Sequence, residues 1–232
     1  MKITVLTLFP KLFDNFLNES IVKKIIQKKI VKIQIVDFRQ FSKEKTKRVD
    51  DYQYGGGAGM VIQLPATVEA IKKYKTKNTK VVLLSPQGQP YSQIKARQLS
   101  KNKDLILIAG HYEGFDERLI NYVDEVVSIG DYILTGGEIP TMVLIETIIR
   151  LQDKAINNES LINETFDNNL LDYPVYTKPL KYDGYEVPKV LLSGNHKLIK
   201  EYRLQQQILK TKKYRNDMYK KYLKENKNAK TK

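Results

Sequence analysis

The chain has 232 residues, no cysteine and a formal net charge of +14 at pH 7. The length is enough for one sizeable core and a smaller module. The absence of cysteine excludes disulfides, thiolate metal sites and cysteine nucleophiles, which is typical of the reducing cytoplasm. No apolar run approaches the roughly 20 residues that span a bilayer, so we expect a cytoplasmic protein of two domains with no membrane association.

The apolar pattern predicts alternating strands and helices through the first two thirds of the chain. Strands are expected at 2–8, 31–37, 80–84, 104–109 and 124–128. Helices are expected at about 10–28, 65–74, 91–101, 115–121 and 140–150. This order is typical of an α/β fold, with a mostly parallel sheet covered by helices on both faces.

The remaining third of the chain has a different composition. From about 151 to 175 the periodicity is lost and Asn, Asp and Glu dominate, which indicates a linker. A helical stretch is expected from His196 to Tyr222, followed by a disordered end from Lys224. We therefore predict an α/β domain at 1–160, a linker or lid at 161–176, and a smaller, mainly helical domain at 177–232.

Positive charge gathers at the C-terminal end. Residues 197–232 contain 13 Lys or Arg against 3 Asp or Glu, a net of +10 out of +14. Such concentration favours a polyanion such as RNA as a partner; a lysine-rich solvated surface is the alternative. The cations alternate with tyrosines, which either stack on unpaired bases or pack in a helical core: Tyr202, Tyr214, Tyr219 and Tyr222.

Three apolar strands each end in a loop rich in glycine and polar groups. Val81–Leu84 leads into SPQG, Leu105–Ala109 into GHYEG, and Val123–Ile129 into GDYILTGGE. At the carboxyl edge of a parallel sheet, such loops expose backbone amides and carbonyls to a small ligand. The pattern predicts a ligand site where the three loops meet.

Other motif classes are missing from the sequence. It has no G-x-x-x-x-G-K-[ST] for nucleotide phosphates and no G-x-S-x-G for a serine nucleophile. The two histidines, His111 and His196, are 85 positions apart and no H-E-x-x-H is present, so we predict no bound structural or catalytic zinc.

Six motifs carry a resemblance to a known family. They are YGGGAGM (54–60), SPQG (85–88), GHYEGFDER (110–118), SIGDYILTGGE (128–138), LLDYPVYTKP (170–179) and VPKVLLSGNH (187–196). In this order they resemble the bacterial tRNA (guanine-N1)-methyltransferases, the TrmD family of the SPOUT superfamily. The resemblance implies a trefoil knot in the sheet, with the loop 128–138 threaded through it. It also implies methyl transfer from S-adenosyl-L-methionine to N1 of guanine 37 of tRNA, 3′ of the anticodon.

Further expectations follow from the same resemblance. The enzyme should be a homodimer with its active site at the subunit interface, and magnesium is a candidate second cofactor. The residues that match the family's donor-contacting stretches are Leu84, Ser85, Pro86, Gly110, Tyr112, Glu113, Ile129, Gly130, Tyr132, Leu134, Gly136 and Gly137.

Methylation of guanine N1 requires removal of the N1 proton, for which a carboxylate base and a nearby cation suffice. The family places an Asp before LLD as the base and an Arg upstream as its partner. In this sequence Glu164 stands in place of that Asp, one residue closer to Arg150. We predict Glu164 as the base and Arg150 as its partner; Glu159 and Asp167 stay open as alternatives.

The resemblance also implies residues that bind the tRNA: Asp50, Gly55, Lys178, His196 and Arg203. Asp50 can accept hydrogen bonds from the guanine edge. The sequence departs from the family pattern at other positions, with His111 where many relatives have Arg and Lys178 in place of another Arg, and Lys178 lacks the bidentate guanidinium. Two rival functions remain: ribose 2′-O-methylation of RNA, and tRNA binding without catalysis.

Overall fold

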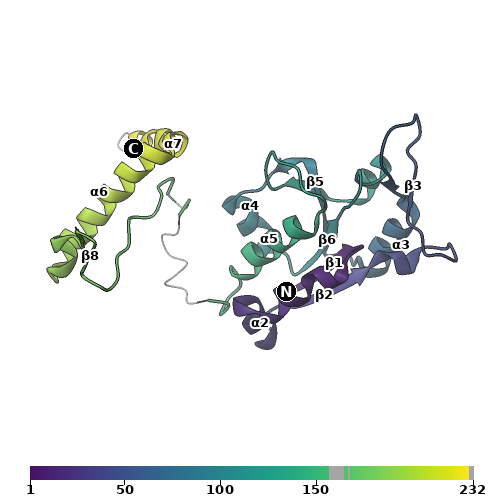
Figure 1. Cartoon of the computed structure of the whole chain (residues 1–232), viewed down its shortest axis with the longest axis horizontal. Coiled ribbons are helices and arrows are strands. Elements are labelled where there is room, and N and C mark those ends of the chain that lie inside the picture. The colour runs from purple at the N-terminus through teal and green to yellow at the C-terminus, as the bar shows by residue number, and fades with distance from the viewer. Residues whose placement is uncertain (157–164, 167, 230–232) are drawn as a thin grey trace. The chain divides into compact units, whose positions relative to one another are not determined.

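The structure is a computed structural model that describes residues 1–156, 165–166 and 168–229. The chain forms two compact units, Met1–Asn158 and Glu159–Lys232 (Figure 1). The first unit contains both strands and helices around a central sheet, and the second contains a short hairpin and two longer helices.

A five-stranded parallel sheet forms the centre of the first unit, as the alternation of strands and helices predicted. Its strands are β1 (Lys2–Thr7), β2 (Lys32–Asp37), β5 (Thr79–Pro90), β6 (Asp104–Ala109) and β7 (Glu125–Ser128), in the spatial order β2-β1-β6-β5-β7. Every neighbouring pair in this sheet is parallel. All the carboxyl ends therefore lie at one edge, where the three glycine-containing loops begin.

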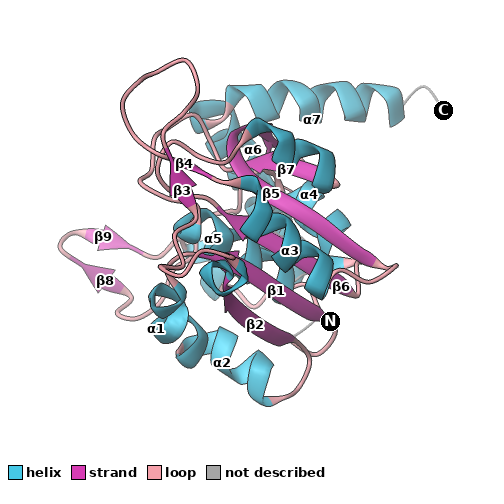
Figure 2. Ribbon diagram, turned by 90° about the vertical axis from the view of Figure 1, so that its right-hand side faces the viewer, coloured by secondary structure: helices cyan, strands magenta, loops and turns pink. Residues whose placement is uncertain are grey.

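Apolar side chains alternate between the two faces of the sheet. On β6, Leu105 and Leu107 belong to one core, and Ile106 and Ile108 belong to the other. Residues of α2 (Ser20–Gln27), α4 (Gln93–Ser100) and α5 (Glu138–Ile149) complete the first core. The second core includes residues of α3 (Leu64–Tyr74) and of the 3-10 helices η2 (Phe38–Phe41) and η3 (Glu117–Tyr122). Helices thus cover both faces, which explains the continuous apolar runs of the strands (Figure 2).

Local structure differs from the sequence expectations in three places. The helix expected at about 10–28 is divided into η1 (Pro10–Phe13), α1 (Asp14–Asn18) and α2, with Glu19 extended and Ser20 at a φ of 51°. That left-handed backbone conformation interrupts an α-helix. The segment expected as a helix at 115–121 is the 3-10 helix η3, and β5 continues to Pro90, six residues past its expected end.

The polar loop expected at 43–59 carries a short antiparallel pair, β3 (Asp50–Asp51) and β4 (Val61–Ile62). Between them lies YGGGAGM, in which Gly55, Gly56, Gly57 and Gly59 all have positive φ. Residues with a side chain rarely adopt this backbone, so the path of the loop depends on glycine.

The second unit contains a hairpin and two helices. The hairpin strands β8 (Lys181–Tyr182) and β9 (Tyr185–Glu186) flank an Asp-Gly turn that was not predicted from the sequence. After η5 (Lys189–Leu192) follow α6 (His196–Tyr214) and α7 (Asn216–Ala229), so the disorder expected from Lys224 is wrong up to Ala229. Lys and Glu are good helix formers, which accounts for the continuation.

Two hydrogen bonds connect the segment 169–171 to α6 and α7. The backbone amide of Leu171 donates to the hydroxyl of the buried Thr211 on α6 at 2.8 Å, and Asn169 donates to Glu225 on α7 at 2.9 Å. No helix in the described part of the chain is long and apolar enough to cross a membrane.

Candidate active site

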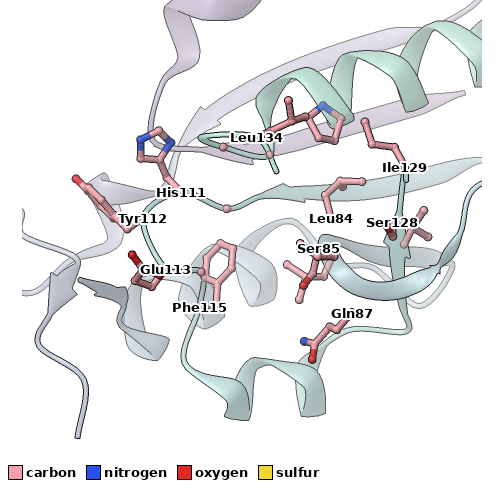
Figure 3. Close-up of a pocket in the computed structure, with 18 of the residues that line it drawn as sticks. Leu84, Ser85, Gln87, His111, Tyr112, Glu113, Phe115, Ser128, Ile129 and Leu134 are labelled. Carbon is pink, nitrogen blue, oxygen red and sulfur yellow. The ribbon is translucent and has the colours of Figure 1, made fainter. Parts of the chain in front are cut away.

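A bulge within β5 and the loops after β6 and β7 surround one cavity of about 500 Å³ at the carboxyl edge of the sheet. This volume is typical of a small-molecule site, for which about 300–1,000 Å³ is usual. All the residues predicted to contact the donor line the cavity: Leu84, Ser85, Pro86, Gly110, Tyr112, Glu113, Ile129, Gly130, Tyr132, Leu134, Gly136 and Gly137. Figure 3 shows His111, Tyr112 and Glu113 at one end of the cavity, and Ser85, Gln87, Ser128 and Ile129 at the other.

The first wall comes from an irregularity in β5. Val127 on β7 is the register partner of both Leu84 and Gln89, so the four residues between them bulge out of the ladder. A Cβ on Gly88 would lie 2.4 Å from the backbone nitrogen of Val127. Only glycine allows the returning strand to come this close, and this return places Ser85 and Gln87 at the cavity.

The second and third walls meet where β6 ends. The amide of Gly137 donates to the carbonyl of Gly110 at 2.7 Å, and a Cβ on Gly137 would lie 2.7 Å from the Gly110 nitrogen. His111 and Gly136 form an isolated antiparallel bridge beside this contact. The loop after β7 is therefore anchored by its backbone to the loop after β6.

The loop after β7 also carries an exposed aromatic side chain, Tyr132, at the cavity. Gly130 has a φ of 148°, and a Cβ there would lie 2.4 Å from the ring of Tyr132. The Tyr132 hydroxyl donates to the carbonyl of Ile129 at 3.2 Å, and the hydroxyl of Ser128 donates to the carbonyl of Gly130 at 3.3 Å. This side of the cavity combines apolar surface with backbone groups that can pair with a planar polar ligand.

Glu113 links the cavity to the glycine-rich loop. Its backbone amide donates to the carbonyl of Met60 at 3.0 Å, and the Ile62 amide donates to the Gly114 carbonyl at 2.8 Å. A Cβ on Gly59 would lie 2.4 Å from Oε1 of Glu113. The YGGGAGM loop therefore packs directly against a carboxylate of the cavity.

An ion pair stiffens the cavity rim after β6. Arg118 donates to both oxygens of Asp116, with bonds of 2.9 and 2.6 Å, and its backbone amide also donates to Asp116. The Arg118 side chain lowers the pKa of the Asp116 carboxyl below its usual value, and the main cause is this hydrogen bonding. Asp116 thereby also caps η3.

The predicted catalytic pair is only partly within the described residues. Arg150 follows α5 as its C-cap, and its amide donates to the carbonyl of Glu146 at 3.3 Å. Glu164 lies outside the described residues, as do the alternative bases Glu159 and Asp167. The assignment of the base therefore stays a prediction from the sequence.

The predicted tRNA-binding residues are divided between the two units. Asp50 lies on β3 and Gly55 at the start of the glycine-rich loop, both in the first unit. Lys178, His196 and Arg203 belong to the second unit, where the Arg203 guanidinium lies 4.6 Å from the ring centroid of Tyr173. This distance is within the range of a cation–π interaction.

Several lining residues had been given no role from the sequence, namely Gln87, His111, Phe115, Ser128 and Pro140. All but Pro140 lie within the three motifs SPQG, GHYEGFDER and SIGDYILTGGE. Their position in these motifs was the feature of the sequence that could have identified them as lining residues. Among the described residues, no three His, Cys, Asp or Glu side chains gather as a metal site would require.

Comparison with known proteins agrees with the resemblance found in the motifs. The family described as "tRNA (Guanine-1)-methyltransferase TrmD" matches residues 1–221. A protein of Malacoplasma penetrans named tRNA (guanine-N(1)-)-methyltransferase is 58% identical over 97% of this chain and 100% of its own length. Proteins with the same name from Ureaplasma urealyticum and Mycoplasma genitalium are 52% and 50% identical, over 96% and 100% of this chain and 98% and 100% of their own lengths. Because the match runs through nearly the whole chain, and three of the motifs that carry it line one cavity, this chain belongs to the tRNA (guanine-1)-methyltransferase TrmD family.

Proposed function

We propose that the protein is a tRNA (guanine-N1)-methyltransferase that uses S-adenosyl-L-methionine to methylate N1 of guanine 37, 3′ of the anticodon. The observation that carries this proposal is the family match over residues 1–221. Full-length relatives that are 50–58% identical and bear the same name support it.

The cavity fits the methyl donor by size and by chemistry. Its volume of about 500 Å³ suits a nucleoside with an amino-acid arm. Backbone groups of Ile129, Gly130 and Leu134 would pair with the adenine edge beside the apolar wall, and Gly137 lets the loop after β7 lie directly against the backbone of Gly110 at the cavity. Glu113 would hold a ribose hydroxyl or lie near the cationic sulfur. When bound, the donor supplies a methyl group on a positively charged sulfur.

The base in this proposal is Glu164, with Arg150 as its partner. Glu164 accepts the N1 proton of guanine, and a cation stabilises the negative charge that develops on O6. Support comes from the sequence: Glu164 stands six residues before LLD, where the family motif carries its carboxylate, and no histidine lies between Arg150 and that motif.

The second unit is proposed to bind tRNA. The proposed functional division is a donor-binding domain at 1–160, a linker or lid at 161–176 and a tRNA-binding domain at 177–232. Net charge supports this, because +10 of the +14 lies in residues 197–232. In this proposal Lys178, His196 and Arg203 bind tRNA from the second unit, while Asp50 and Gly55 contact the guanine from the first.

We also propose a homodimer with the active site at the subunit interface. The α5 helix is apolar on nearly all sides, yet Ile139 is 59% exposed and Val143 is also exposed. On the neighbouring η1, Leu12 is 57% exposed. Apolar side chains grouped on neighbouring elements mark an interaction surface, and the occupant here is a second copy of the chain.

A trefoil knot with the loop 128–138 threaded through it belongs to the same proposal. It is supported by the close crossing of Gly88 over Val126 and Val127, and by the contact of Gly137 with Ala109 and Gly110. Magnesium use and a cytoplasmic location, where tRNA is processed, complete the proposal.

Labelled methyl transfer to unmodified tRNA, followed by mass identification of the nucleosides, tests the function. We expect multiple turnover and 1-methylguanosine. A 2′-O-methylated nucleoside would favour the ribose-methylating rival, and tight tRNA binding without turnover would favour a non-catalytic role.

A further inference from the structure

A buried carboxylate lies at the start of α5, next to the donor cavity. Glu138 is 3% exposed, and its Oε1 accepts a hydrogen bond from the hydroxyl of Thr7 at 2.8 Å. Thr7 ends β1 and is fully buried. A carboxylate removed from water is costly unless hydrogen bonds or opposite charge compensate it. The base proposed above does not involve Glu138, so its burial needs another explanation.

His111 faces this carboxylate from the end of β6. Its Nδ1 lies 3.8 Å from Oε2 of Glu138, and the side chain is 25% exposed. Within the described residues Nδ1 is buried without a hydrogen-bond partner. The distance is too long for a hydrogen bond but lies within the range of an ion pair when the imidazole is protonated. The rings of Phe9 and Tyr112 pack against the imidazole, with centroids at 4.6 and 5.1 Å.

The backbone of the third cavity loop covers this pair. A Cβ on Gly136 would lie 2.4 Å from Oε2 of Glu138 and 2.6 Å from Nδ1 of His111. Gly136 also bridges to His111 through the backbone, and Gly137 donates to the carbonyl of Gly110. Leu134, Gly136 and Gly137 line the cavity, so the pair lies in contact with this wall.

We propose that His111 is a positioning residue for donor binding: its imidazole, paired with the buried Glu138, holds the Leu134–Gly137 wall against the end of β6. This inference rests on the proposed function, because it assigns the cavity to S-adenosyl-L-methionine. It requires a side chain at position 111 with nitrogen atoms that can face Glu138; an aromatic ring alone does not suffice.

Binding of S-adenosylhomocysteine to the full chain, measured by calorimetry, tests the proposal. His111→Phe keeps the ring packing and removes the two ring nitrogens, and it should weaken binding about 10-fold. His111→Arg should restore binding to within about threefold of the unmodified chain, since its guanidinium nitrogens can again face the Glu138 carboxylate. Phe9→Leu is the matched control: it removes the ring against the same imidazole but leaves the ion pair, and it should change binding less than threefold.

A second set of measurements separates positioning from general stability. Glu138→Gln keeps the shape and the bond from Thr7, and it should weaken donor binding as much as His111→Phe does. The double variant should be no weaker than either single variant, because the two residues act as a unit. In kinetics, His111→Phe should raise the KM for the donor about 10-fold, while kcat at saturating donor and the KM for tRNA stay within about twofold.

Three outcomes overturn the inference. The first is donor binding by His111→Phe within twofold of the unmodified chain, and the second is His111→Arg binding as weakly as His111→Phe. The third is a fall in kcat with no change in the KM for the donor. No binding of S-adenosylhomocysteine by the unmodified chain would overturn the proposed function, and this inference with it.

Discussion

Gly88 should be the glycine least tolerant of substitution in the first unit, because it lies where β5 returns across β7. Its φ is outside the left-handed region, so alanine there brings no backbone strain. The difficulty is space: a Cβ would lie 2.4 Å from the nitrogen of Val127, 2.5 Å from its carbonyl carbon and 2.6 Å from the carbonyl carbon of Val126. Favourable contact between carbon atoms needs about 3.5–4.0 Å, so the two strands would have to separate by roughly 1 Å.

The cost follows from what would have to move. Overpacking a core by a methyl group usually costs about 1–3 kcal/mol. The blocking atoms at Gly88 are backbone atoms that cannot rotate away, so Gly88→Ala should reach or exceed about 3 kcal/mol. This is a large part of the roughly 5–15 kcal/mol that stabilises a domain. The shift would also carry Ser85 and Gln87 away from the cavity, so donor affinity should fall as well.

Urea unfolding of Gly88→Ala, together with calorimetry using S-adenosylhomocysteine, checks both effects. Gly56→Ala is the matched control, since Gly56 has a φ of 78° but no atom within 4 Å of the point where a Cβ would lie. That change should cost about 1–2 kcal/mol from backbone strain alone. If Gly88→Ala is no more destabilising than Gly56→Ala, the close crossing of β5 over β7 is not what limits this position.

Three further predictions concern the partly buried phenol of Tyr91, the proposed base and the basic helix α6. Burial raises the pKa of Tyr91 to about 12. Its phenol therefore stabilises the fold below about pH 10 and loses that contribution between about pH 10 and 12. In urea unfolding, the free energy of unfolding of Tyr91→Phe should fall less over this pH window than that of the unmodified chain. Glu164→Gln should slow single-turnover methyl transfer by about 10² to 10⁴ with donor and tRNA dissociation constants nearly unchanged; normal rates there, with slow transfer in Glu159→Gln or Asp167→Asn, would move the base. Arg203→Ala should weaken tRNA binding in filter assays and reduce its salt dependence while sparing donor binding; equal tRNA affinity would leave this cation as solvated surface.

The cavity at the carboxyl edge of the sheet was the part of the candidate site that the sequence predicted best. Gly88, Gly110 and Gly130 each follow an apolar run, and parallel strands bring their carboxyl ends together. Local sequence therefore implied a long-range meeting of three loops, and the cavity lined by all of them agrees with it.

Local breaks and long-range pairs were harder to predict. The helix expected at 10–28 is interrupted at Ser20 by the backbone conformation of one residue inside an otherwise helical pattern. Each strand of the hairpin 181–186 is only two residues long. His111 and Glu138 are 27 positions apart, and neither is unusual in its own motif. Nothing in the local sequence indicates that a histidine will face a buried carboxylate.

The sequence by itself determined the α/β class, the loops of the cavity and the family, because strand periodicity, glycine placement and motif order are properties of consecutive residues. The tertiary structure alone decided the strand order β2-β1-β6-β5-β7, the return of β5 across β7 and the burial of Glu138 beneath Gly136. These depend on which backbones approach within a few ångströms once the core has packed. Such approaches are governed by steric fit and desolvation between segments distant in the chain, which local propensity does not encode.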